Sequence, residues 1–280
     1  MTTTLRPTGP TQQSADGART RRYDVCDNGR PVGTVTLSTD PSFGPSAGVL
    51  DGLRIEEHRR RRGRAIIASL AAEEVLRDWG CMEVRARIPA GNEPALRLAA
   101  VLGYAERSRN MERPTPAHAP ALPPGLVGRP MAPEEFAPWL AGLHEGYARQ
   151  WAERGVPEEQ ARRKSESDHA RLLPQGLATP GVYIHVLERE EDGRAVGHVW
   201  LSGSPTETGA TIGYVFYVEV DPEFRGRGYG RALMGLAAGM ARSAGYDRIG
   251  LHVFTSNTPA RRLYESLGYE PTAHNLVKAL

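Results

Sequence analysis

The segment VFYVEVDPEFRGRGYGR, residues 215–231, joins an apolar strand pattern to a glycine-rich turn and the beginning of a helix. Its glycines, Gly226, Gly228 and Gly230, would let the backbone approach an anion closely. The unpaired N–H groups of a first helical turn, together with the helix dipole, favour a phosphate at that point. A pyrophosphate is the natural ligand of such a turn, although an ordinary strand-to-helix connection can have the same pattern.

The patterns around this segment predict a mixed α/β layer. Alternating apolar and polar residues indicate strands, and apolar residues at spacings of three and four indicate helices. The expected strands are 181–187, 195–201, 212–220, 248–254 and 276–280, and the expected helices are 133–147, 157–173, 231–243 and 258–267. This order predicts a mixed, mainly antiparallel central sheet flanked by helices.

An internal repeat relates the two halves of the chain at a constant offset of 165 residues. A register without gaps over this span indicates two copies of one fold. The repeated positions include Arg60 and Arg225, Gly63 and Gly228, Asn92 and Asn257, Pro94 and Pro259, and the tripeptide Leu-Gly-Tyr at 102–104 and 267–269.

Composition divides the chain into four segments. Residues 1–21 are polar and rich in Thr, Gly, Pro and Gln, so we expect a disordered tail there. Prolines recur in residues 114–125 too often for a helix or a central strand, which predicts an extended, semi-rigid linker. The expected domains are therefore 22–113 and 126–280.

Two segments of the second copy resemble the fingerprint of the GNAT superfamily of acyl-CoA-dependent N-acyltransferases. The family pattern is Arg or Gln, two residues, Gly, one residue, then Gly or Ala, and here it reads Arg225-Gly226-Arg227-Gly228-Tyr229-Gly230. The second segment runs from Asn257 to Tyr269 after its strand. The resemblance covers most of 126–280, and with the repeat it implies two GNAT-like domains in tandem.

The resemblance implies a role for individual residues of the second copy. Main-chain groups of Val218 to Val220 would bind the pantetheine arm of acetyl-CoA and polarise the thioester carbonyl. Tyr264 would face the thiol, and Asn257 would hydrogen-bond the pantetheine or a nearby backbone group. The pyrophosphate would be held by the turn. The implied cofactor residues are Val218, Val220, Arg225, Gly226, Arg227, Gly228, Tyr229, Gly230, Arg231 and Asn257.

The expected chemistry is attack of an amine on the thioester through a tetrahedral intermediate, with an amide donor stabilising the charge on the carbonyl oxygen. Tyr264 would hydrogen-bond the departing sulfur. Since amines are mostly protonated near neutrality, a base or a water path must remove a proton. His252, where some relatives carry a glutamate base, competes for this role with Glu219 and Tyr214. No metal is expected, because no metal-ligand spacing relates the histidines that we interpret as structural, His144, His169, His185 and His198.

The first copy keeps the glycine turn but loses other candidate residues. Ala99 stands where the second copy has Tyr264, and Arg87 stands where it has His252. This copy also begins near its first hairpin, without room for the two leading helices that would shape an acceptor site. We interpret 22–113 as a degenerate domain that supports the catalytic copy at 126–280, with CoA binding by the first copy left open.

Composition excludes several other classes of protein. The longest apolar run falls short of the roughly 18 residues that span a bilayer, and the polar opening is unlike a secretory signal. Two cysteines in 280 residues argue against a disulfide framework, and a net charge of +2 does not indicate a nucleic-acid partner. The basic residues are nearly all Arg, as in GC-rich bacterial genomes. We expect a cytoplasmic bacterial protein.

These observations predict an N-acetyltransferase that moves an acetyl group from acetyl-CoA to a primary amine of a small molecule. Two alternatives stay open: acetylation of a protein or peptide, and a non-catalytic CoA-binding regulatory module. A homodimer is compatible with the sequence. The residues between 133 and 173, which would recognise the acceptor, match no motif that identifies it.

Overall fold

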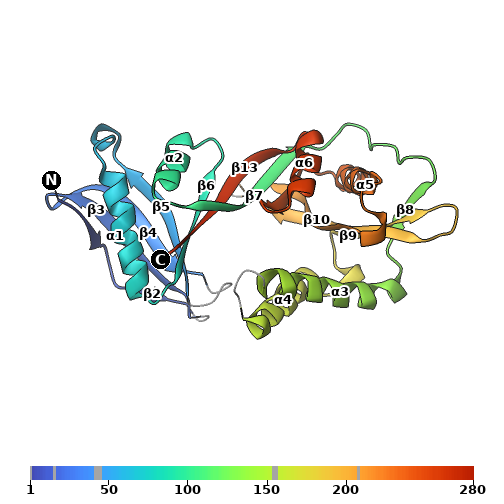
Figure 1. The fold of residues 1–280 in the computed structure, drawn as a ribbon, viewed down its shortest axis with the longest axis horizontal. Helices are drawn as coiled ribbons and strands as arrows, with labels where there is room; N and C mark the ends of the chain where they lie inside the picture. The colour runs from blue at the N-terminus through green and yellow to red at the C-terminus, as the bar shows by residue number, and fades with distance from the viewer. Residues whose placement is uncertain (1, 15–16, 41–45, 153–156, 207–208) are drawn as a thin grey trace. The chain divides into compact units, whose positions relative to one another are not determined.

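The computed structural model describes residues 2–14, 17–40, 46–152, 157–206 and 209–280 (Figure 1). They form two compact units. Unit 1 comprises Met1–Arg109, Phe254–Ser256 and Pro271–Leu280, and unit 2 comprises Asn110–Val253 and Asn257–Glu270. No helix in the described part of the chain is long and apolar enough to cross a membrane.

Unit 2 is built on a sheet with helices on both faces. Its strands run in the order β8, β9, β10, β11 and β12, and only β11 and β12 are parallel. The strands are β8 (Leu126–Pro130), β9 (Val182–Arg189), β10 (Ala195–Pro205), β11 (Thr211–Val220) and β12 (Arg248–Phe254). The helices are α3 (Pro133–Ala152), α4 (Glu158–Leu172), α5 (Tyr229–Ser243) and α6 (Thr258–Ser266), with short turns η3 (Gly176–Ala178) and η4 (Pro222–Phe224).

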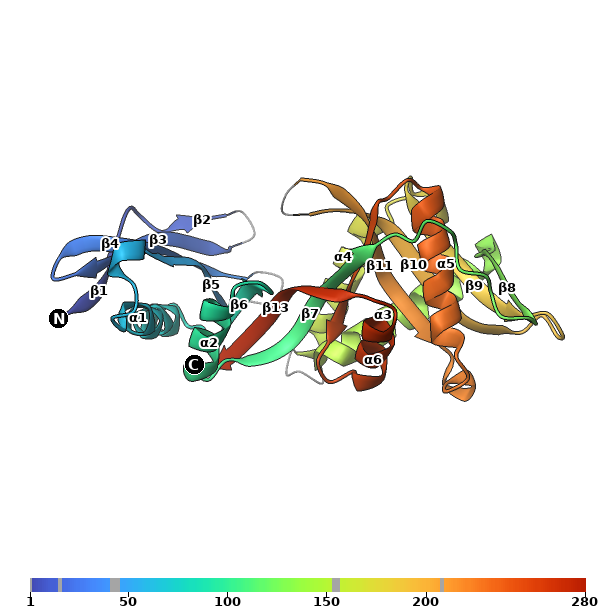
Figure 2. The same ribbon diagram turned by 90° about the horizontal axis from the view of Figure 1, so that it is seen from above.

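Two apolar cores hold these helices against the sheet. Leu233 and Ala237 of α5 share a buried core with Leu251 of β12, so α5 and α6 cover one face (Figure 2). On the other face, Leu143 of α3 packs with Trp200 of β10 in a second core. Both cores follow from the period of two in strands and of about 3.6 in helices, which brings apolar residues to one side of each element. The expected mixed, mainly antiparallel sheet flanked by helices is confirmed.

Unit 1 repeats this plan without the counterparts of α3 and α4. Its strands run in the order β1, β3, β4, β5, β6 and β13, and β2 pairs with β3. They are β1 (Thr3–Pro7), β2 (Gln12–Gln13), β3 (Arg19–Asp27), β4 (Arg30–Thr39), β5 (Ala47–Ile55), β6 (Glu83–Pro89) and β13 (Glu270–Ala279). Its helices are α1 (Arg64–Asp78), α2 (Glu93–Val101) and the turn η2 (Glu57–Arg59).

The last strands of the two copies are exchanged. β13, which ends the second copy in the sequence, pairs antiparallel with β6 in unit 1, from Ala273 opposite Pro89 to Ala279 opposite Glu83. The end of β7 (Ala105–Pro114), the last strand of the first copy, lies beside β12 in unit 2. The compact units therefore differ from the expected bounds 22–113 and 126–280 at these strands.

For residues 2–14 and 17–21, the structure corrects the expectation of a disordered tail over residues 1–21, and residues 1, 15 and 16 lie outside the described part of the chain. Thr3–Pro7 forms β1, which pairs antiparallel with β3 from Thr3 opposite Asp27 to Pro7 opposite Tyr23. Leu5 packs on the core of unit 1, and Arg6 forms a 3.1 Å ion pair with Asp24. An edge strand needs only one apolar face, so a polar composition does not exclude it. The last strand also begins earlier than expected, at Glu270 instead of 276.

The proline-rich segment, residues 115–125, is extended and packs on unit 2, and we refer to it as the strap. In Figure 2 it passes over α5. Leu122 joins the core that contains α5, and Pro120 lies against Gly235. The predicted linker is therefore a packed part of unit 2.

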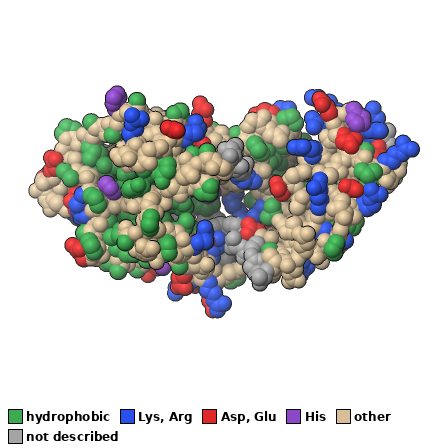
Figure 3. Space-filling view, turned by 180° about the vertical axis from the view of Figure 1, so that it is seen from behind, with side chains coloured by type: hydrophobic (Ala, Val, Ile, Leu, Met, Phe, Trp, Pro, Cys, Tyr) green, Lys and Arg blue, Asp and Glu red, His purple; other side chains and the backbone are tan. Residues whose placement is uncertain are grey.

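On the face drawn in Figure 3, basic and acidic side chains are interspersed.

Candidate functional site

The backbone of β11 becomes free of its neighbour halfway along the strand. β11 and β12 pair only from Gly213 to Val215, opposite Ile249 to Leu251. At that point Phe216 is an extra residue, because Trp200 of β10 lies opposite Tyr217 and Leu201 lies opposite Val215. A bulge of this kind bends a strand and increases its twist. Residues 216–220 thus form an edge that, within the described chain, no strand covers on the β12 side.

Val218 and Val220 direct their backbone groups to this open edge. The amide of Asp221 donates to the Val196 carbonyl at 3.0 Å, and the Glu219 carbonyl lies where a Cβ on Gly197 would be, so residues 219 and 221 face β10. Alternate residues of a strand point to opposite edges. The Val220 carbonyl accepts a hydrogen bond from Nε of Arg225 at 3.1 Å. The edge can therefore bind the amides of an extended ligand.

The glycine turn forms a nest of amides at the N-terminus of α5. Gly226 and Gly228 have φ of +79° and +84°, values at which any residue with a Cβ is strained. The amides from Gly226 to Gly230 have no acceptor among the described residues. The Arg231 amide, expected to join them, instead donates to the Gly228 carbonyl at 3.0 Å. Five consecutive amides at a helix N-terminus suit a diphosphate.

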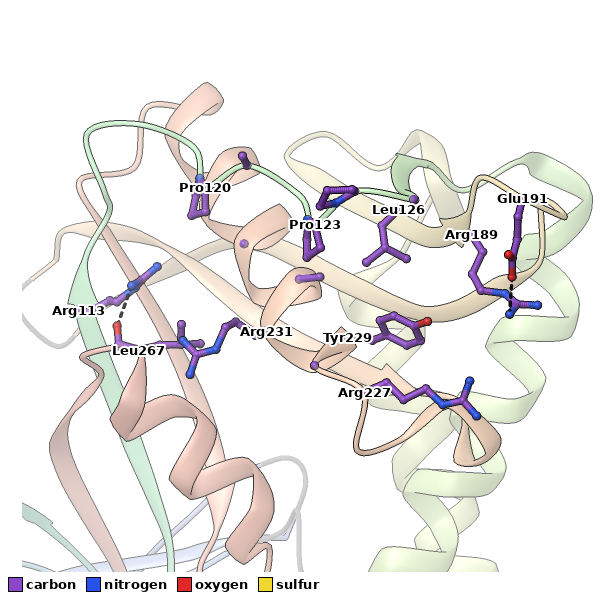
Figure 4. A pocket seen from close by; sticks show the side chains of 16 residues that line it. Arg113, Pro120, Pro123, Leu126, Arg189, Glu191, Arg227, Tyr229, Arg231 and Leu267 are labelled. Carbon is purple, nitrogen blue, oxygen red and sulfur yellow. Dashed lines mark hydrogen bonds and ion pairs between the residues drawn. The ribbon is translucent and has the colours of Figure 1, made fainter.

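A cavity of about 620 Å³ adjoins this turn, between the beginning of α5 and the strap (Figure 4). Its lining includes four arginines, Arg113, Arg189, Arg227 and Arg231, and one acidic residue, Glu191. Arg189 is paired with Glu191 at 2.7 Å and also with Asp192. The motif indicated Arg227 and Arg231, but nothing in the sequence placed Arg113, Arg189 or the strap at this site.

Tyr264 lies on α6, and Asn257 is the residue that caps the beginning of this helix. Tyr264 is only 6% exposed and packs with Tyr269 at 5.9 Å between ring centroids. Burial raises the pKa of Tyr264 to about 12, so its hydroxyl stays protonated at neutral pH. The Asn257 side chain caps α6 by accepting a hydrogen bond from the Ala260 amide at 3.2 Å. The first copy has the same cap at Asn92, which indicates that capping is shared by both copies.

Glu219 and His252 lie on the sheet face opposite to Tyr264. Leu251 and Val253 point into the core that contains Tyr264, so His252 between them points to the other face and is exposed. Glu219 accepts a hydrogen bond from the Tyr217 hydroxyl and lies 3.5 Å from the Arg225 guanidinium. Burial, then the hydrogen bond and charge of Glu219, raise the pKa of Tyr217, so this tyrosine is a proton donor to the carboxylate.

An aromatic cluster lies on that same face, beneath α3 and α4. Trp139 of α3 contacts the rings of Trp200 and Tyr217, each at 6.1 Å between centroids. His169 of α4 packs at 6.2 Å from Trp200, and burial lowers its pKa. The rings of His144 and His169 lie 4.8 Å apart between centroids. The indole nitrogens of Trp139 and Trp200 are buried without an acceptor among the described residues.

The first copy keeps the backbone plan of this site. β5 and β6 pair only from Ala47 to Val49, and Nε of Arg60 donates to the Ile55 carbonyl at 2.8 Å, as Arg225 does to Val220. Its turn differs in content. Arg64, in the place of Tyr229, is 3% exposed, donates to the Arg59 carbonyl at 2.7 Å and pairs with Asp27. The turn of unit 1 therefore carries the buried guanidinium of Arg64, where unit 2 has Tyr229.

Comparison with known proteins agrees with this geometry. The model of the acetyltransferase (GNAT) family matches residues 4–104 and 142–269. This chain belongs to the GNAT family. It is therefore an acyl-CoA-dependent acetyltransferase, and the two matched regions confirm the expected tandem of GNAT-like domains. The family uses acetyl-CoA, the co-substrate that the turn and the open edge of β11 suit.

The relatives are acetyltransferases that match either most of this chain or about half of it. A mycothiol acetyltransferase of Thermobispora bispora is 34% identical over 220 residues, which cover 76% of this chain and 70% of that protein. An uncharacterized N-acetyltransferase of Bacillus subtilis, YycN, is 32% identical over 145 residues, 51% of this chain and 91% of that protein. A solved GCN5-related N-acetyltransferase from Sphaerobacter thermophilus shares the fold, with a TM-score of 0.59, 20% identity, and coverage of 92% of this chain and 80% of that one.

Proposed function

We propose that this protein transfers the acetyl group of acetyl-CoA to a primary amine of a small molecule, at the site in unit 2. The observation that supports this most directly is that unit 2 combines the open edge of β11, the five unpaired amides of the turn and the buried hydroxyl of Tyr264. The first copy has Ala99 in place of Tyr264. Relatives named mycothiol acetyltransferases support a small-molecule acceptor.

In this proposal, the backbone of unit 2 binds and activates the thioester. The amides and carbonyls of Val218 and Val220 hold the pantetheine arm, and one amide of this edge donates to the thioester carbonyl. A fixed donor at that oxygen stabilises the negative charge that develops when the amine attacks. The amides of Gly226 to Gly230 hold the diphosphate, while Arg225 keeps the edge in place through its bond to Val220.

Tyr264 assists the departure of the thiolate. A hydroxyl whose pKa is about 12 does not give up its proton completely to a thiolate, whose conjugate acid has a pKa near 8.5. It can instead donate a hydrogen bond to the sulfur as the carbon–sulfur bond breaks. Tyr264 therefore stabilises the leaving group while keeping its own proton.

Glu219 is our first candidate for the group that receives the proton of the amine, and His252 is the second. The Tyr217 hydroxyl holds the Glu219 carboxylate, which keeps one oxygen in a fixed position on the acceptor side of the sheet. A fixed acceptor is favourable for general base catalysis, directly or through one water. His252 is exposed on the same face and could serve through water. In this proposal the amine approaches on the sheet face that α3 and α4 cover, so the base must lie on that face.

A single-turnover assay tests the proposal. The full-length protein is mixed with [13C]acetyl-CoA and a panel of primary amines, and acetylated products are detected by mass spectrometry. We expect one class of amine to accumulate label in the first turnover. Consumption of the thioester by water alone would contradict the proposal, and labelling only of peptides would favour peptide acetylation.

Cytoplasmic location, bacterial origin and a homodimer remain parts of the proposal.

A further inference from the structure

The strap packs on α5 at two glycines of that helix. A Cβ placed on Gly235 would lie 3.6 Å from Pro120, an ordinary contact, and one on Gly239 would lie 3.3 Å from Ala119, a tight one. Glycine inside a helix costs roughly 1 kcal/mol relative to alanine. The first copy has Leu70 and Glu74 at the equivalent positions, where no bulky neighbour must be avoided. The close packing of an extended segment on this helix is therefore specific to unit 2.

The cavity under the strap carries uncompensated positive charge. Among the described residues, Arg113, Arg227 and Arg231 form no ion pair with a carboxylate, whereas Arg189 forms two. Figure 4 shows Arg113 and Arg231 at the end of the cavity near Leu267, with Tyr229 and Arg227 on the side of the turn. Guanidinium groups without a carboxylate partner are well suited to bind a phosphate.

Arg113 is held in place but keeps one donor available. One Nη atom donates to the Leu267 carbonyl at 2.7 Å, and the guanidinium lies 5.1 Å from the Tyr269 ring centroid. Its Nε is buried and out of reach of a ligand, which leaves the other Nη atom as the donor for one. Arg231 nearby donates to the Ser266 hydroxyl at 2.6 Å. The two side chains converge from β7 and α5 on one end of the cavity.

We propose that the strap covers the nucleotide end of acyl-CoA, and that Arg113, assisted by Arg231, binds the 3′-phosphate of its ribose. This inference rests on the proposed function. The amides of the turn account for the diphosphate but leave the 3′-phosphate, a separate dianion, without a partner. A cavity of about 620 Å³ falls in the usual range for small-ligand sites and can hold an adenosine group.

Arg113 could also serve only as a cap for the C-terminus of α6, because Leu267 is the residue that ends that helix. A capping role alone would affect every ligand of unit 2 equally. Binding of the 3′-phosphate, by contrast, affects only ligands that carry this group. Coenzyme A and 3′-dephospho-coenzyme A differ by that phosphate alone, so the pair separates the two roles.

The experiment measures binding of both compounds by isothermal titration calorimetry to the full-length protein and its Arg113→Met variant. We expect the wild type to prefer coenzyme A by at least tenfold, the usual effect of a charge-assisted hydrogen bond. Arg113→Met should lose most of this preference while binding 3′-dephospho-coenzyme A nearly as the wild type does. The control Arg242→Met, which removes an exposed arginine at the other end of α5, should keep the preference.

Equal binding of the two compounds by the wild type, or equal weakening of both by Arg113→Met, would overturn the inference. If Arg113→Met fails to fold, as judged by its melting curve, Arg231→Met provides the same comparison and must reduce the preference. Acetyl transfer by a wild type that binds both compounds equally would leave the proposed function intact. A clear preference for coenzyme A without any acetyl transfer would support the 3′-phosphate site and contradict the proposed function.

Discussion

Replacing Tyr217 by Phe removes one hydroxyl from the acceptor side of the site and tests the role of Glu219. The ring contact with Trp139, 6.1 Å between centroids, is retained in the variant. Only the hydrogen bond to the Glu219 carboxylate is lost. This hydrogen bond holds the carboxylate in one position, so its loss leaves the base less often aligned with the amine. We therefore expect the chemical step, and with it kcat, to slow.

The size of this effect follows from the exposure of Glu219. A hydrogen bond to a charged group contributes about 1.5–3 kcal/mol when it is shielded from water. The Glu219 side chain is 42% exposed, so water competes and we discount the effect to about 1 kcal/mol. At about 1.36 kcal/mol per factor of ten in rate, kcat should fall by roughly fivefold.

The assay measures kcat and KM for wild type and Tyr217→Phe, with acetyl-CoA affinity measured separately. We expect kcat to fall roughly fivefold, while affinity for acetyl-CoA stays within twofold. Tyr183→Phe, which removes a hydroxyl from β9 of the same unit, is the matched control and should leave kcat in place. An unchanged kcat in Tyr217→Phe would refute Glu219 as the base and favour His252.

Three further variants test other parts of the structure. Tyr264→Phe should lower kcat much more than acetyl-CoA affinity, and equal losses in both would contradict its role at the leaving group. Gly235→Leu should push Pro120 off α5 and weaken coenzyme A binding in calorimetry, because the strap would no longer cover the nucleotide; unchanged binding would contradict a role for the strap. Lys278→Met leaves the buried Glu73 carboxylate without the ammonium group that pairs with it at 2.6 Å. This variant should lower the free energy of unfolding of unit 1, measured in urea, by about 3 kcal/mol.

Strand and helix patterns were predictable wherever burial imposes a clear period. The helix at residues 231–243 is found at Tyr229–Ser243, and the strand at 248–254 is found at Arg248–Phe254. The glycine turn was predictable because glycine adopts positive φ without strain, as Gly226 and Gly228 do. The prediction of a disordered tail over residues 1–21 was wrong, because composition alone cannot show that a polar strand will pair with the edge of a sheet.

The exchange of last strands could not be predicted from the repeat. β7 and β13 follow the same Leu-Gly-Tyr tripeptide in the two copies, so local patterns fit either pairing partner equally well. Prolines predicted that the strap is extended but not where it packs. The signal that was present is the pair Gly235 and Gly239, four residues apart inside a helix, which indicates a close neighbour. The bulge at Phe216 has no sequence signal that we can identify.

The most direct test of acetyl transfer at unit 2 is the fate of labelled acetyl groups in extracts of the producing cells. Wild-type protein and its Tyr264→Phe variant are incubated with extract and [13C]acetyl-CoA, and all small molecules are surveyed by mass spectrometry. We predict a labelled N-acetyl product that forms with the wild type and much more slowly with the variant. Equal label with both proteins, or acetate as the sole labelled product, would contradict the account.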